Sequence, residues 1–128
     1  MNTKSNRLLV VDDEPGIRNF LRTVAEQLDF EVYAIGNAEE FSGAVEEFRP
    51  TAIILDLNMH GSDGVDLFHH LARQESEAQV LVISGEDIHV LNAAKRLGSS
   101  QGLNMAGALQ KPVLLPDLKA ALKRVLTG

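Results

Sequence analysis

The 128-residue sequence contains no cysteine and no long apolar run. The first absence excludes a disulfide framework, a thiolate nucleophile and a cysteine metal site. The second excludes a membrane-spanning helix, which needs roughly 20 predominantly apolar residues. Residues 1–7 are polar and lack the apolar core of a signal peptide. We therefore expect a cytoplasmic protein without a membrane partner.

Positive charge is also scarce. Twelve Lys and Arg residues stand against 18 Asp and Glu residues, which gives a net charge of −6 and a pI of about 5.1. Nucleic-acid backbones call for a basic face, so direct binding of nucleic acid is not expected. A basic protein partner or a metal cation remains compatible with this charge. The hydrophobic share of 45% disfavours disorder, and the length is typical of one domain, which we expect to cover residues 1–128.

Short apolar runs alternate with amphipathic segments along the chain. An apolar run bounded by polar residues is typical of a parallel strand buried on both faces. The runs are residues 7–11, 31–35, 52–56, 79–83 and 105–110. The segments between and after them carry helix signals, such as Pro15 and Pro116 at helix starts and a capping box at Asn37 and Glu40. This repeated β-α pattern predicts an α/β domain, with helices on both faces of a five-stranded parallel sheet.

Helical spacing also predicts which side chains face the sheet. In the helix expected from about residue 87 to residue 100, these are Val90, Ala94 and Leu97. His69 and His70 lie next to each other on the preceding predicted helix, and adjacent helical residues point about 100° apart. We therefore expect a solvated face there rather than a pair that shares a ligand.

Polar residues follow four of the apolar runs. Asp12 and Asp13 follow the first run, Asp56 ends the third, Ser84 follows the fourth and Lys111 follows the fifth. Right-handed crossovers bring the carboxyl ends of parallel strands to one edge of the sheet. We therefore expect three carboxylates, a hydroxyl and an ammonium group to lie together.

These groups suit phosphoryl chemistry. Crowded carboxylates repel one another unless a cation joins them, and ligation by oxygen alone favours Mg²⁺. A carboxylate such as Asp56 can itself be the nucleophile and form an aspartyl phosphate. Mg²⁺ and Lys111 would neutralise the charge on the transferring group, and Ser84 would hydrogen-bond one of its oxygens. When only its own strand is considered, Asp56 could equally be a residue that caps the following turn. The polar residues at the other strand ends favour a catalytic role for Asp56.

The sequence resembles the response-regulator receiver domain of two-component signal transduction over nearly its whole length. The motifs that carry the resemblance are Val10-Val11-Asp12-Asp13-Glu14, Asp56-Leu57-Asn58-Met59 with Asp63-Gly64, Ile83-Ser84-Gly85 and Lys111-Pro112. The resemblance implies a doubly wound, flavodoxin-like (βα)5 fold with strand order 2-1-3-4-5. It also implies a signalling phosphoprotein that catalyses only its own phosphorylation and autodephosphorylation.

For the acidic residues, the resemblance implies specific roles. Asp56 would accept a phosphoryl group from a phosphohistidine on a sensor histidine kinase or a phosphotransfer protein. Mg²⁺ would be held by Asp13, Asp56 and the backbone carbonyl of Asn58, with Asp12 helping through water.

The remaining site residues are assigned in the same way. Ser84 would contact the phosphoryl group and shift toward it, and Lys111 would pair with it, next to a cis bond to Pro112. Asn58 and Glu86 occupy positions that tune the lifetime of the phosphate in this family, and polar groups there favour a labile phosphate. Two exposed residues without a kinetic role are the alternative.

The chain departs from the family pattern at three places. Ala108 stands where many receivers carry a switching Tyr or Phe, and His60 stands where a proline is frequent. Ser84 and Lys111 are 27 positions apart (111 − 84), longer than the family norm by about one helical turn or more.

This long segment is similar to receivers that precede an EAL-type cyclic-di-GMP phosphodiesterase domain, although the chain has no EAL motif of its own. The chain is then either a receiver excised from a larger protein or a relative that lost its output domain. An idiosyncratic insertion is the alternative. In all of these cases the output domain or partner lies outside this chain.

Two other functions are compatible with parts of the pattern. A haloacid-dehalogenase-type phosphatase also uses an Asp nucleophile after a strand, but needs a second Asp two residues on, where this chain has Asn58. A receiver-like interaction module that is never phosphorylated would keep the fold without the chemistry.

Overall fold

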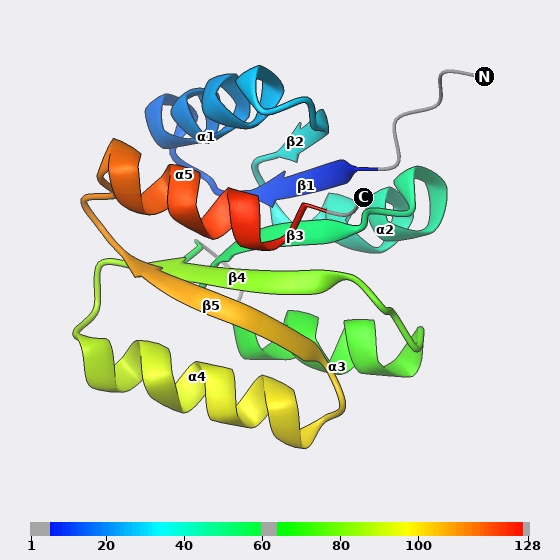
Figure 1. The fold of residues 1–128 in the computed structure, drawn as a ribbon. Helices are drawn as coiled ribbons and strands as arrows, with labels where there is room; N and C mark the ends of the chain where they lie inside the picture. The colour runs from blue at the N-terminus through cyan, green and yellow to red at the C-terminus, as the bar shows by residue number, and fades with distance from the viewer. Residues whose placement is uncertain (1–5, 60–63, 127–128) are drawn as a thin grey trace.

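The computed structural model describes residues 6–59 and 64–126 of the chain. Strands and helices alternate along the described residues as the sequence pattern predicts (Figure 1). In chain order the elements are β1 (Arg7–Val11), α1 (Pro15–Gln27), β2 (Glu31–Ile35), the 3₁₀ helix η1 (Ala38–Glu40), α2 (Phe41–Phe48), β3 (Ala52–Asp56), α3 (Gly64–Arg73), β4 (Gln79–Ser84), α4 (Ile88–Ser100), β5 (Asn104–Gln110) and α5 (Leu115–Arg124).

The five strands form one parallel sheet with the order β2-β1-β3-β4-β5. This confirms the predicted flavodoxin-like α/β fold and its strand order. The central strand β3 is buried at all five positions, because helices cover both of its faces. The edge strand β2 instead exposes Glu31 and Tyr33 in alternation with less exposed residues.

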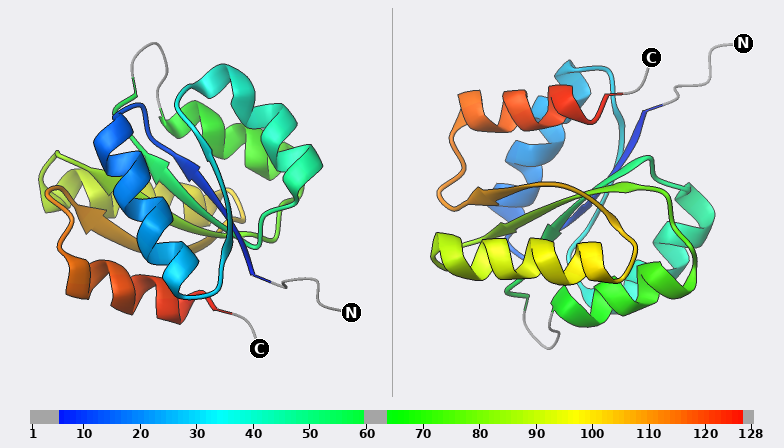
Figure 2. Two further views of the ribbon diagram at one scale, coloured as in Figure 1. Left: turned by 90° about the horizontal axis from the view of Figure 1, so that it is seen from above. Right: turned by 60° about the horizontal axis from the view of Figure 1, so that its bottom comes forward.

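Two apolar cores lie on opposite faces of the sheet, since successive side chains of a strand point to opposite sides. Leu9, Ile53 and Val82 belong to the core under α2, α3 and α4. Leu8 and Ile54 belong to the core under α1 and α5. Figure 2 shows these two helical layers with the sheet between them. Because all neighbouring strands of the sheet are parallel, their carboxyl ends lie at the same edge.

The capping box before α2 is confirmed in part. The Asn37 side-chain oxygen accepts a hydrogen bond from the Glu40 backbone N–H at 3.0 Å. The Glu40 carboxylate, however, accepts from the Asn37 side-chain amide at 2.6 Å rather than from its backbone N–H. The first turn that follows is the 3₁₀ helix η1, and α2 continues from it.

The inner face of α4 differs from the prediction at one residue. The Asp87 side chain caps the helix by accepting from the backbone N–H groups of His89 and Val90. The sheet-facing side of α4 includes Leu91 and Ala94, and Val90 is 43% exposed. The assignment of Val90 to the inner face was therefore wrong, because Leu91, Ala94 and Gly98 also have helical spacing and form the buried side of α4. None of the described helices combines the length and apolar character needed to cross a membrane.

Candidate functional site

The predicted polar residues converge at the carboxyl ends of the strands. Asp12 follows β1 directly and Asp56 is the last residue of β3, and these two strands are neighbours in the sheet. Both carboxylates are almost fully buried, with exposures of 0% for Asp12 and 1% for Asp56. Ser84 ends β4 and Lys111 directly follows β5. The parallel topology thus brings together side chains that are far apart in the sequence.

Lys111 is the cation of this site. Its Nζ lies 3.2 Å from Asp56 Oδ2, 3.4 Å from Asp12 Oδ2 and 2.7 Å from Glu14 Oε1. Burial by itself lowers the pKa of Lys111, but the hydrogen bond to Glu14 and the charges of Asp56 and Asp12 outweigh this effect and raise the pKa above its ordinary value. Lys111 therefore carries its positive charge throughout the neutral pH range.

Glu14 was not among the predicted site residues. It makes the shortest of the three Lys111 contacts, although its own side chain is 57% exposed. The sequence held one signal for it, since Glu14 continues the acidic run after β1. Its contact with Lys111 joins residues 97 positions apart, and that pairing depends on the fold.

Backbone amides orient one oxygen of each buried carboxylate. Asp12 Oδ1 accepts from the Glu14 N–H at 2.9 Å, and Asp56 Oδ1 accepts from the Asn58 N–H at 3.0 Å. Asp12 Oδ2 accepts no hydrogen bond from the described residues, and its 3.4 Å ion pair with Lys111 is long. Burial, together with the charge of Asp56, raises the pKa of the Asp12 carboxyl, against the opposing effects of the Glu14 N–H and Lys111.

The acidic residues fit a divalent cation. Asp12, Asp13, Glu14 and Asp56 each offer a carboxylate oxygen, and these oxygens all lie within 4.8 Å of one another. Hard cations such as Mg²⁺ and Ca²⁺ prefer oxygen ligands of this kind. Asp12 Oδ2 is buried, accepts no hydrogen bond from the described residues and has only a long ion pair with Lys111, which compensates its charge poorly. The cluster can therefore bind a metal ion, with Glu14 as an additional candidate beside the predicted Asp12, Asp13 and Asp56.

Ser84 lies fully buried beside this cluster and is held from two loops. Its Oγ accepts from the Asn58 side-chain amide at 2.8 Å and from the Glu86 N–H at 3.0 Å. Its backbone carbonyl accepts from the Lys111 N–H at 2.8 Å. The side chain of Asn58 thus contacts Ser84, while a metal-binding role for the Asn58 carbonyl stays a prediction.

Other predicted features have mixed outcomes. The Lys111–Pro112 peptide bond is cis, which confirms that prediction. His69 is exposed as expected, whereas His70 is only partly exposed, so the predicted solvated face holds for His70 only in part. The His70 ring packs edge-on against Phe41, with 5.8 Å between ring centroids, because α3 turns this position toward α2. His60 and Asp63 lie outside the described residues.

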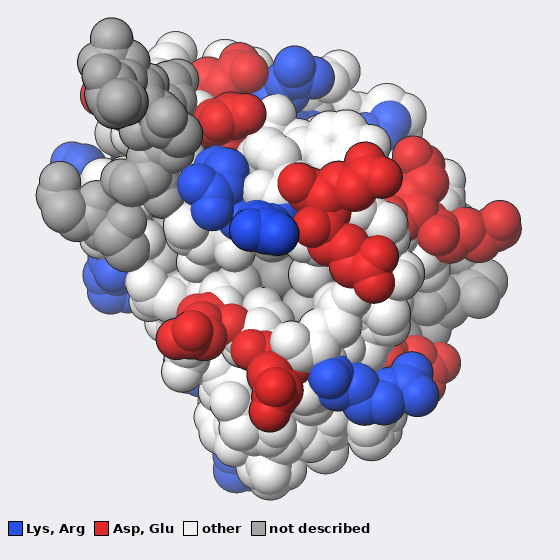
Figure 3. Space-filling model, turned by 90° about the vertical axis from the view of Figure 1, so that its right-hand side faces the viewer, with Lys and Arg blue, Asp and Glu red and all other residues white. Residues whose placement is uncertain are grey.

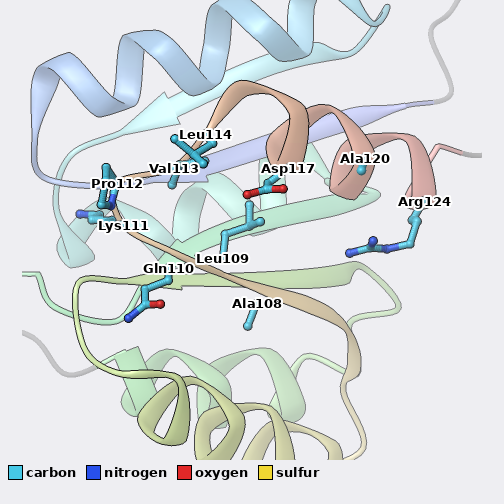
Figure 4. A pocket seen from close by; sticks show the side chains of 10 residues that line it. All are labelled: Ala108, Leu109, Gln110, Lys111, Pro112, Val113, Leu114, Asp117, Ala120 and Arg124. Atoms are coloured by element: carbon cyan, nitrogen blue, oxygen red, sulfur yellow. The ribbon is translucent and has the colours of Figure 1, made fainter.

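A pocket of about 530 Å³ adjoins the site and is lined by residues of β5, the following loop and α5, including Lys111 (Figure 4). Its lining includes Ala108, Gln110 and Lys111 from β5 and the following loop, and Asp117 and Arg124 from α5. The carboxylates of Asp12 and Asp56 do not line it. The carboxylates therefore form a compact cluster beside this pocket, and Lys111 belongs to both.

Comparisons with known proteins agree with this arrangement. The family model described as "Response regulator receiver domain" matches residues 8–123. The chain is 32% identical over 120 residues to the positive alginate biosynthesis regulatory protein of Pseudomonas aeruginosa, which covers 91% of this chain and 46% of that protein. It is 22% identical over 123 residues to sporulation initiation phosphotransferase F of Bacillus subtilis, covering 95% and 94% of the two chains.

A solved structure supports the same family. The crystal structure of a response regulator from Colwellia psychrerythraea superimposes with a TM-score of 0.77 at 34% identity, covering 92% of this chain and 94% of that one. The chain belongs to the response regulator receiver domain family. It spans less than half the length of the Pseudomonas relative, so that protein's activity as a whole is not transferred to it.

Proposed function

We propose that the chain is a phosphoacceptor switch in which Asp56 takes a phosphoryl group from a phosphohistidine on a sensor histidine kinase or phosphotransfer protein. The observation that carries the proposal is the placement of the Asp56 carboxylate. One of its oxygens is held by the Asn58 N–H at 3.0 Å, and the other lies 3.2 Å from Lys111 Nζ. A buried carboxylate oriented by two donors at the end of a strand is a suitable nucleophile.

The transfer step is an exchange of bonds at phosphorus. An oxygen of ionised Asp56 forms the new O–P bond, and the P–N bond of the donor breaks, with its electron pair returning to the imidazole nitrogen. Lys111 stays protonated because its pKa is raised, and its charge stabilises the transferring group. The Ser84 hydroxyl donates a hydrogen bond to a phosphoryl oxygen after transfer.

Mg²⁺ is the metal that this chemistry calls for. Asp13, Asp56 and the Asn58 carbonyl would hold it, with Asp12 contributing through water. When bound, Mg²⁺ neutralises phosphoryl oxygens and removes the repulsion between the carboxylates. The four clustered carboxylate oxygens and the buried Asp12 Oδ2, which accepts no hydrogen bond from the described residues, support this assignment.

The chain acts on itself and on no metabolic substrate in this proposal. A second catalytic Asp two residues after the nucleophile would favour a phosphatase, but Asn58 occupies this position and uses its amide to donate to Ser84. Asn58 and Glu86 favour a short-lived phosphate. The phosphorylated state is read by an output domain or partner outside this chain, and an association with an EAL-type domain stays a prediction from the long segment between Ser84 and Lys111.

The test is intact mass spectrometry after incubation with acetyl phosphate and MgCl₂, with Asp56→Asn as the isosteric control. We expect one phosphoryl adduct on the wild-type chain, and none in the control or in the presence of EDTA. The absence of an adduct with acetyl phosphate and with a panel of phosphorylated histidine donors would contradict the proposal. The chain would then be a receiver-like interaction module.

A further inference from the structure

Asn58 contacts two residues of the site through two different groups. Its backbone N–H donates to Asp56 Oδ1 at 3.0 Å, and its side-chain Nδ2 donates to Ser84 Oγ at 2.8 Å. Asn58 is itself exposed, whereas Ser84 and Asp56 are buried. A substitution that shortens the Asn58 side chain therefore removes the contact with Ser84 and retains the backbone contact with Asp56.

The Ser84 hydroxyl oxygen is fully engaged in this structure. A hydroxyl has two acceptor lone pairs, and both face donors, one from the Asn58 side chain and one from the Glu86 N–H. The two donors lie on the loops after β3 and after β4, so they hold the hydroxyl between them. The hydroxyl proton is still available for an acceptor, but Oγ can change its position only by giving up at least one of these two hydrogen bonds.

We propose that Asn58 is a positioning residue that holds the Ser84 hydroxyl in its unphosphorylated orientation. A phosphoryl group on Asp56 accepts from the Ser84 O–H rather than donating to it, and a shift of Oγ toward that group breaks the hydrogen bond from Asn58. The side chain of residue 108, which is alanine here, provides no ring to follow the hydroxyl, so the contact with Asn58 becomes a main determinant of the balance between the two orientations. The consequence for switching rests on the proposed function, whereas the restraint on Ser84 does not.

This role differs from an effect of Asn58 on phosphate lifetime. A residue that orients an attacking water acts only after Asp56 carries phosphate, and its effect does not depend on Ser84. A residue that restrains Ser84 acts before phosphorylation, and its effect disappears when the Ser84 hydroxyl is removed. The two roles can therefore be separated by the state in which they are measured and by a double-mutant cycle.

The first experiment measures amide hydrogen exchange of Glu86 by NMR in the unphosphorylated protein. The Glu86 N–H is protected by its bond to Ser84 Oγ, so a freed Ser84 should lose that bond more often. We expect Asn58→Ala to speed exchange at Glu86 about fivefold, which corresponds to the loss of one hydrogen bond. Equal exchange in wild type and Asn58→Ala would overturn the proposal.

Gln110→Ala is the matched control for this experiment. Gln110 also donates a side-chain amide hydrogen bond to the loop after β4, to the Glu86 carbonyl at 3.1 Å, but not to Ser84. We expect Gln110→Ala to leave the exchange of the Glu86 N–H within about twofold of wild type. An increase as large as that in Asn58→Ala would indicate a general loosening of the loop and would also overturn the proposal.

The second experiment measures the rate of adduct formation with acetyl phosphate and MgCl₂ in wild type, Asn58→Ala, Ser84→Ala and the double variant. We expect Asn58→Ala to accelerate phosphorylation about fivefold when Ser84 is present and to have no effect in the Ser84→Ala background. The same effect in both backgrounds would contradict a role through Ser84. If wild type forms no adduct, the proposed function fails, and the exchange experiment alone decides the restraint on Ser84.

Discussion

At the amino ends of β1 and β3, Arg7 and Thr51 link the two strands through hydrogen bonds to each other, whereas at the carboxyl ends of the same strands the carboxylates of Asp12 and Asp56 lie close together. The Arg7 N–H donates to Thr51 Oγ1 at 2.9 Å, and the Thr51 N–H donates to the Arg7 carbonyl at 2.8 Å. The Arg7 guanidinium donates to the carbonyls of Phe48 and Arg49, at the end of α2.

Figure 3 shows the amino-end side of the molecule, where basic and acidic side chains are interspersed over the visible surface. At the opposite end, Lys111 is the cation shared by three carboxylates. At the amino end Arg7 donates to backbone carbonyls and to Thr51, whereas at the carboxyl end several carboxylates lie close together around one lysine. Substitutions at the amino ends of the strands should therefore change stability but not phosphorylation. Substitutions at the carboxyl ends should change both.

Lys111→Met should have the largest effect. It leaves the buried carboxylates of Asp12 and Asp56 without their cation, and breaking a buried ion pair from one side costs about 3 kcal/mol or more. Phosphorylation by acetyl phosphate should fall by about a hundredfold or more, because a charge that stabilises the transferring group is lost. Urea unfolding in EDTA and in MgCl₂ measures the first effect, and Mg²⁺ should restore part of the stability.

The control for this prediction is Lys123→Met, at an exposed position in the last turn of α5. It should leave phosphorylation unchanged and alter stability by less than about 0.5 kcal/mol. A Lys111→Met protein as stable as wild type in EDTA would show that the carboxylates do not depend on Lys111 as the distances indicate.

Thr51→Val tests the opposite end of the sheet. It retains the shape of the side chain but removes the hydroxyl that accepts from the Arg7 N–H and donates to the Arg7 carbonyl. We expect a loss of about 1–2 kcal/mol in the free energy of unfolding, as for buried polar groups left unpaired. The phosphorylation rate at saturating Mg²⁺ should not change, and a clear decrease would contradict the separation between the two ends.

Asp12→Asn should stabilise the protein in the absence of metal, whereas most substitutions destabilise. Asparagine retains the acceptor for the Glu14 N–H and replaces Oδ2, whose ion pair with Lys111 is long, with a neutral amide group beside Asp56. In EDTA the free energy of unfolding should rise by about 1 kcal/mol, the scale of one buried polar group. The affinity for Mg²⁺, measured by isothermal titration calorimetry, should fall. A loss of stability in EDTA would mean that the charge of Asp12 is well compensated by Lys111.

The same carboxylate predicts a pH dependence. The pKa of Asp12 is raised in the folded state, chiefly by burial and then by the charge of Asp56. The folded protein therefore holds this proton more tightly than the unfolded chain, whose Asp pKa is about 3.9. The contribution of Asp12 to stability is present below that value and is lost as the pH rises through the folded pKa. In EDTA, Asp12→Asn should lack this decrease, which urea unfolding across the acidic pH range would detect.

Arg22→Ala should have the smallest effect. Arg22 and Glu26 form a 3.3 Å ion pair on the surface of α1, with both side chains about half exposed. Such pairs contribute about 0.3–0.5 kcal/mol, and added salt should remove even that. A loss above about 1 kcal/mol in thermal unfolding would show that the surface of α1 contributes more than its exposure implies.

Much of the fold follows from local features of the sequence. Buried parallel strands need continuous apolar runs, so the central strands were predicted to within a residue or two, and the topology then placed Asp12, Asp56, Ser84 and Lys111 at one edge. The candidate cation site was predictable for the same reason. Its members follow strand ends, and strand ends meet wherever the sheet is parallel.

The tertiary structure decided which side chains contact one another. The Glu14–Lys111 pair and the bond from Asn58 to Ser84 join residues that are 97 and 26 positions apart. Hydrophobic periodicity determines which face of an element is buried, because burial depends on many side chains together. A hydrogen bond between two side chains depends instead on angstrom-scale distances between loops, which no spacing along the chain encodes. The sequence by itself therefore determined the sheet and the edge that bears the site, and only the tertiary structure determined how Lys111 and Ser84 are held there.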